Sequence, residues 1–72
     1  MEEVLEIVNS VVNKDVSNST SLVDDKILNS LNIIKLVALL NEHFGIRISP
    51  MHLLPSNFNS VEAIYNLVSS LM

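Results

Sequence analysis

The feature that most constrains the fold is the stretch from Asn29 to Gly45, which predicts one long helix. Apolar residues recur in it every three or four positions, and further apolar residues occupy its other sides. Asn29 is a favourable N-cap residue, and Gly45 suits the left-handed backbone that ends many helices. We therefore predict a helix over residues 30–43. Because it is apolar nearly all round, it should be central to a bundle or partly covered by a partner.

The composition of the 72-residue chain favours an all-α domain. Hydrophobic residues make up 49% of the chain, with one Gly and two Pro, which is typical of helices rather than of turn-rich β folds. A chain of this size buries only about 60% of its unfolded surface, so one efficient core is all that it can support. We expect a single domain over residues 1–72.

Two further segments have apolar residues at helical spacing. Residues 2–13 and residues 60–71 each carry such a stripe, and we expect a helix in both. Asn59 is the expected cap of the last helix, with Glu62 three residues later as in a capping box. The helices over residues 2–13, 30–43 and 60–71 should form the bundle.

The remaining segments predict a short helix and a long loop. Ser49 followed by Pro50 predicts a short third helix through about Leu54, and residues 55–58 should form a turn anchored by Phe58. Residues 14–29 form a loop whose length is unusual in so small a domain and often functional. The expected fold is a small four-helix bundle of three main helices and a short third one.

The charge is acidic and unevenly distributed. The formal net charge is −4, which disfavours a nucleic-acid binder because such a protein should present a basic patch. Residues 1–25 hold six acidic residues against Lys14, a net charge of −5. Residues 26–72 hold two acidic residues against three basic ones, a net charge of +1. The long central helix thus lies in the less acidic part.

Neither a membrane segment nor an oxidising compartment is indicated. The longest apolar runs are far shorter than the about 20 residues that a spanning helix needs, and the acidic residues after Met1 are unlike a signal peptide. The chain has no cysteine, which excludes disulfides, cysteine-ligated zinc and a cysteine nucleophile. We expect a cytoplasmic protein without membrane insertion.

Most residues that could perform chemistry are poorly placed for it. His43 and His52 fall on different predicted elements without a carboxylate cluster, so we expect two surface histidines and no metal site. One Gly is too few for a phosphate-binding loop, and a serine hydrolase would need a larger scaffold. Ser30 remains, at the amide-rich end of the central helix. The residues alone leave open whether it does more than start that helix.

The segment from Asn29 to Ile46 resembles the acyl and peptidyl carrier protein family. It reads NSLNIIKLVALLNEHFGI, and that family carries Asp-Ser-Leu before a helix that ends in an acidic-Phe-Gly-Ile type of segment. The preceding helix, the loop with Asp24 and Asp25, and the residues from Asn57 to Ile64 are similar to the family as well. The likeness therefore spans essentially the whole chain.

The resemblance implies a post-translational arm on Ser30. A phosphopantetheinyl transferase would move 4′-phosphopantetheine from coenzyme A to the Ser30 hydroxyl, where the positive end of the helix favours an anion. The thiol of the arm would then hold an acyl or aminoacyl group as a thioester. An adenylating, ligating or acyltransferase enzyme would load it, and acceptor enzymes would receive it. The chain would be a monomeric carrier and not an enzyme.

Four residues depart from the family pattern, one of them Asn32, which follows Leu31 at a position that is often acidic in relatives. Asn29 replaces the usual aspartate, which is associated with magnesium and with transferase contact, and Lys35 and Asn41 stand where fatty-acid carriers usually place acids. Docking should therefore be more apolar and less sensitive to salt, which favours a dedicated carrier, similar to D-alanyl, aminoacyl or specialised polyketide and nonribosomal-peptide carriers. The residues expected at the partner surface are Asn29, Leu31, Ile34, Lys35, Ala38, Glu42 and Met51.

One alternative of a different class stays open. The surplus apolar surface of the central helix would also suit a small interaction module that binds a partner helix or self-associates without any prosthetic group.

Overall fold

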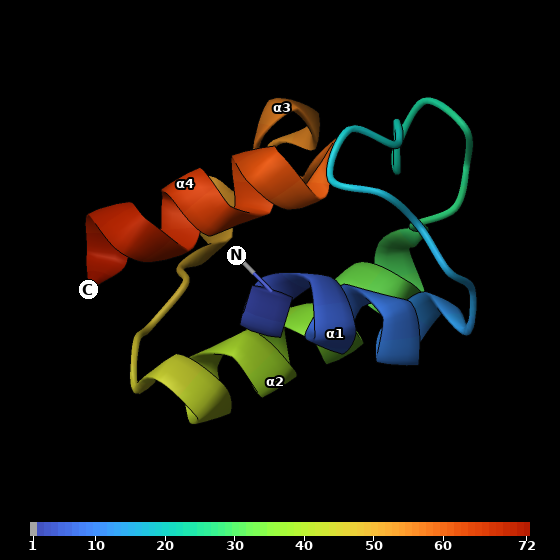
Figure 1. Ribbon diagram of the computed structural model, residues 1–72. Helices are drawn as coiled ribbons and strands as arrows, with labels where there is room; N and C mark the ends of the chain where they lie inside the picture. Colours follow the sequence, from blue (N-terminus) through green and yellow to red (C-terminus); the bar gives the residue numbers. More distant parts are fainter. Residues whose placement is uncertain (1) are drawn as a thin grey trace.

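The computed structural model describes residues 2–72, and its described part is helical without strands (Figure 1). The elements are α1 (Glu2–Val12), α2 (Ser30–Phe44), the 3-10 turn η1 (Pro50–His52), α3 (Pro55–Phe58) and α4 (Val61–Leu71). The expected all-α class and its three main helices are confirmed. Among residues 2–72, no helix combines the length and the apolar character that crossing a membrane requires.

The ends of α2 are formed as the sequence predicts. Asn29 has extended backbone, and its side-chain oxygen accepts a hydrogen bond from the Asn32 amide at 2.9 Å. Gly45 has left-handed backbone, with φ of 64°, and its amide donates to the Asn41 carbonyl. The cap and the stop are therefore confirmed, and the helix continues one residue beyond the expected end, to Phe44.

The helix predicted from Pro50 to about Leu54 begins as expected, with Ser49 as its cap residue and Pro50 at its first position, but its end was wrong. It is the three-residue 3-10 helix η1, and the short helix α3 occupies residues 55–58, where a turn was expected. The cause is Pro55, because a proline forces the preceding residue out of helical backbone and is itself favoured at the first position of a new helix. Leu54 is accordingly extended, with φ of −98° and ψ of 142°. Phe58 anchors α3 as expected, with 1% of its surface exposed.

The cap of α4 is Ser60 and not Asn59. Ser60 has the extended backbone of an N-cap residue, and its hydroxyl accepts from the Ala63 amide at 3.0 Å. Asn59 has helical backbone, with φ of −78° and ψ of −6°, so it is not in position to cap the helix that follows. Its side chain binds the long loop instead.

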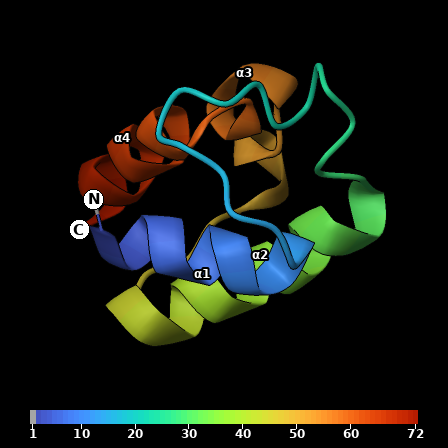
Figure 2. The same ribbon diagram turned by 45° about the vertical axis from the view of Figure 1, so that its right-hand side comes forward.

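The core lies between the three main helices (Figures 1 and 2). Helix α1 packs against both α2 and α4, and α3 packs against α4. The buried side chains of the long loop, Leu22 and Leu28, join the same core, so the loop is fixed at its middle and near its end. The residues of the core are Val4, Val8, Leu22, Leu28, Leu36, Leu40, Ile48, Phe58, Val61, Ile64, Leu67 and Val68.

Candidate functional site

Ser30 is the first residue of α2 and is exposed, at the point where the long loop becomes helix. The first amides of an α-helix have no carbonyl partner within the helix, and together with the helix dipole they favour an anion. Asn29 uses only one of these amides, that of Asn32. The first turn of α2 contains no acidic residue that would repel a phosphate. A phosphodiester on the Ser30 hydroxyl therefore fits the position.

The loop before Ser30 is held by hydrogen bonds between its own backbone groups. The Leu22 carbonyl accepts hydrogen bonds from the amides of Ile27 and Leu28, both at 2.9 Å. Lys26, between these ends, has left-handed backbone with φ of 59°, as a tight reversal requires. The Asn32 side chain also donates to the Ile27 carbonyl at 3.4 Å. The loop therefore delivers residues 29 and 30 to α2 from a fixed direction.

Asn59 holds this loop from the other side of the domain. Its carbonyl accepts from the Leu22 amide at 2.8 Å, and its side-chain oxygen accepts from the amides of Val23 at 2.9 Å and Asp24 at 3.1 Å. Its side-chain nitrogen donates to Oδ2 of Asp24 at 3.2 Å. We did not predict this role, because the contact joins residues 35 and 36 positions apart and has no local sequence signal.

An exposed apolar face lies on α2 beside Ser30. Leu31 is 76% exposed and Ile34 64% exposed, and Ala38 and Lys35 are exposed as well. Positions three, four and seven apart lie on one side of a helix, so the structure brings these four residues together. We call Leu31, Ile34, Lys35 and Ala38 the α2 face.

The other residues expected at the partner surface are also exposed. Asn29 adjoins Ser30, and Glu42 lies one turn beyond Ala38. Met51, on η1, is 83% exposed, and it is followed by two exposed leucines that we did not expect at this surface, Leu53 and Leu54. The missed signal was Pro55, because it ends the turn before these leucines could enter a helix and be buried.

The two histidines have structural partners. His43 Nε2 lies 3.0 Å from Oε2 of Glu3 and so joins α2 to α1 at the surface. His52 Nδ1 accepts from the Ser49 amide at 3.1 Å and lies 3.0 Å from the Ser49 hydroxyl, which closes η1. Within residues 2–72, no three potential metal ligands lie close enough together to hold an ion.

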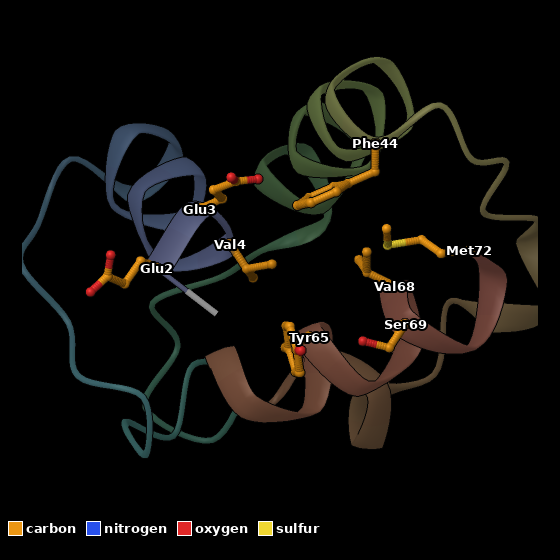
Figure 3. Close-up of a pocket in the computed structure, with 8 residues that line it drawn as sticks. All are labelled: Glu2, Glu3, Val4, Phe44, Tyr65, Val68, Ser69 and Met72. Atoms are coloured by element: carbon orange, nitrogen blue, oxygen red, sulfur yellow. The ribbon is translucent and has the colours of Figure 1, made fainter.

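A hollow in the described part of the chain lies far from Ser30. It has a volume of about 600 Å³ and opens between the start of α1, the end of α2 and the end of α4 (Figure 3). Phe44, Val4 and Val68 form its apolar wall, with Tyr65 beside them. Phe44 and Ser30 are the two ends of the 15-residue helix α2, which at its ordinary rise are about 20 Å apart. Ser30 is therefore exposed at the opposite end of α2 from this hollow.

A small helical bundle that presents an exposed serine at the start of its central helix has the form of a carrier domain. The family model described as the phosphopantetheine attachment site matches residues 2–68, and the chain belongs to this family. The resemblance to acyl and peptidyl carrier proteins is thereby confirmed. Members of the family carry 4′-phosphopantetheine covalently. No curated protein matches the chain.

Proposed function

We propose that the chain is a single carrier domain whose 4′-phosphopantetheine is attached to Ser30. The observation that carries the proposal is the exposure of Ser30 at the first position of α2, within the residues that match the family. In the attachment, the Ser30 Oγ–phosphorus bond forms with the phosphate of coenzyme A that bears pantetheine. The bond from that phosphorus to the oxygen of adenosine 3′,5′-bisphosphate breaks, and the hydroxyl proton passes to a base of the transferase. The helix N-terminus stabilises the phosphodiester that results.

The proposed function of the loaded chain is delivery. The arm supplies a thiol that holds an acyl or aminoacyl group as a thioester, and the chain itself performs no chemistry. Because Ser30 lies on an open surface, the arm is free to enter the active sites of a loading enzyme and of acceptor enzymes. The α2 face adjoins the attachment point and is mainly apolar, which supports docking of these enzymes there and a dedicated rather than a fatty-acid carrier.

The test is the intact mass of the protein after incubation with coenzyme A and a broad-specificity phosphopantetheinyl transferase. Wild type should gain the mass of one phosphopantetheine, and Ser30→Ala should gain none. Ser56→Ala, which removes another exposed serine near the start of a helix, is the matched control and should be modified like wild type. An unmodified wild type with several transferases would refute the proposal.

The exposed leucine and isoleucine of the α2 face also support the second candidate function, an interaction module without a prosthetic group. That function predicts association that strengthens with protein concentration and that Ser30→Ala leaves intact. Sedimentation velocity over a range of concentrations separates the two candidates, because the carrier is expected to be monomeric.

A further inference from the structure

Asn59 is distant from α2 in the sequence, but its side chain forms hydrogen bonds with the loop that precedes α2. It lies between α3 and α4, and every hydrogen bond of its side chain goes to residue 23 or 24 of the loop. Figures 1 and 2 both show the loop passing beside the start of α4. The amide of Glu62, in the first turn of α4, adds a hydrogen bond to the Asn18 carbonyl at 3.3 Å. The start of α4 thus holds the loop at two points.

The hold on the loop extends to the first turn of α2 through a short series of contacts. Asn59 fixes Leu22 to Asp24, and the Leu22 carbonyl fixes the amides of Ile27 and Leu28. The next residue is the N-cap Asn29. The first turn of a helix has fewer hydrogen bonds than the turns that follow, so its order depends on the cap and on the chain before it.

We propose that Asn59 is a positioning residue for the attachment of phosphopantetheine at Ser30. The proposal rests on the proposed function. Apolar burial of Leu22 and Leu28 sets how deep the loop lies, and the directional hydrogen bonds of Asn59 set its orientation. Ser30 must approach the phosphorus of coenzyme A within a narrow geometry, and a displacement of about 1 Å is enough to slow such a reaction by up to about 100-fold.

Capping of α4 does not account for these contacts. Ser60 already caps that helix, so the Asn59 side chain is not needed there. Ser60→Ala is therefore a matched control: it removes one side-chain hydrogen bond next to Asn59, lowers stability, and leaves the hydrogen bonds of the Asn59 side chain in place.

The decisive variant is Asn59→Asp. The new carboxylate still accepts from the Val23 and Asp24 amides, but it places a negative charge where the donor to Asp24 Oδ2 stood, at 3.2 Å. Like charges at this distance repel. Adding Asp24→Asn restores a donor and an acceptor with the two roles exchanged, so the double variant should recover the contact.

The experiment measures kcat and KM for transfer from coenzyme A to each variant by a broad-specificity transferase, at a temperature where all are folded by circular dichroism. For Asn59→Asp we expect kcat to fall by about tenfold with KM unchanged, because the α2 face stays intact. The double variant should return to within about twofold of wild type. Amide hydrogen exchange at Ile27 and Leu28 should quicken in Asn59→Asp and slow again in the double variant.

Four results would overturn the proposal: wild-type kcat in Asn59→Asp, no recovery in the double variant, a rise in KM alone, or an equal fall of kcat in Ser60→Ala. Hydrogen exchange keeps this inference separate from the proposed function. If wild type accepts no phosphopantetheine, the proposed function fails, whereas quickened exchange at Ile27 and Leu28 would still establish the contact between Asn59 and the loop.

Discussion

Four asparagines perform the same task at breaks in the helical structure. The side-chain oxygen of each accepts a backbone amide: Asn9 that of Val16, Asn29 that of Asn32, Asn41 that of Ile48, and Asn59 those of two loop residues. An asparagine oxygen suits such positions because it replaces a missing backbone acceptor without adding charge. Asn41, expected as a neutral substitute for a surface acid, therefore has a structural role: it is partly buried and fixes the chain that follows α2.

The substitution Asn29→Asp separates the effect of residue 29 on the capping of α2 from its effect on the rate of phosphopantetheine transfer. Asp and Asn cap helices about equally well, and a charge at the N-terminus adds about 0.3–1 kcal/mol, so stability should stay equal or rise slightly. The aspartate that carrier proteins usually have at this position is associated with magnesium, and the carboxylate would offer such an ion a charged ligand that an amide lacks. We expect kcat/KM for transfer to rise at least about threefold. Asn29→Ala, which loses the cap, should be slower, and an unchanged rate in Asn29→Asp would contradict the prediction.

The effect of substituting Gly45 on stability depends on its backbone conformation alone. Gly45 has φ of 64°, and a Cβ added there would meet nothing within 4 Å. Gly45→Ala should therefore cost about 1–2 kcal/mol of unfolding free energy through the left-handed conformation only. Urea unfolding measures it, with the slope against urea unchanged. Gly45→Asn should cost less, since asparagine tolerates this conformation, and equal losses in the two variants would refute the explanation.

At the scale of elements, α2 serves two surfaces at once. Leu36 and Leu40 are fully buried on one side, and Leu31 and Ile34 are largely exposed on another. Leu36→Ala would create a cavity and lower the free energy of unfolding by about 2–5 kcal/mol. That is a large share of the total of about 5–15 kcal/mol that is typical of a domain. Changes on the α2 face leave that core untouched. Docking and folding can therefore be tested separately on the same helix.

Leu31→Glu and Ala38→Glu test the α2 face. Each places a charge on the surface where we propose that a loading enzyme packs, and an unpaired buried charge is costly. We expect loading of the phosphopantetheine form by its ligase to fall by at least about tenfold in kcat/KM. Helical content by circular dichroism should stay near that of wild type.

The matched control is Asn66→Glu, which adds the same charge at an exposed position of α4 and should load like wild type. Wild-type loading of both face variants would remove the α2 face from the docking surface.

Elements set by local rules could be predicted from the sequence, and those set by distant contacts could not. The periodicity of α1, α2 and α4 and the cap chemistry of Asn29 and Gly45 act within one or two turns. The break at Pro55 is also local, and its effect on Leu54 could have been read from the sequence. The role of Asn59 could not, because its partners become neighbours only once α4 packs beside the loop.

At the scale of the whole molecule, most acidic residues precede Ser30, the proposed attachment point, in the sequence. Acidic residues cluster in the first 25 positions, which carry a net charge of −5, whereas residues 26–72 carry +1. In the structure the first group lies on α1 and on the loop, and the α2 face has Lys35 as its charged residue. For the docking proposed on that face, we therefore expect long-range attraction to contribute little and apolar contact to provide most of the affinity.

Binding of the loading enzyme should accordingly depend weakly on salt. Exposed charges are screened within about 10 Å at 0.1 M salt, and only such charges make association strongly sensitive to it. Between about 0.05 and about 0.5 M NaCl, we expect Kd from calorimetry to change by less than about threefold. Lys35→Gln should remove most of the remaining dependence, and Leu31→Ala should weaken binding equally at every salt concentration. A Kd that rises tenfold or more over this range would mean that charge, rather than the apolar α2 face, holds the complex together.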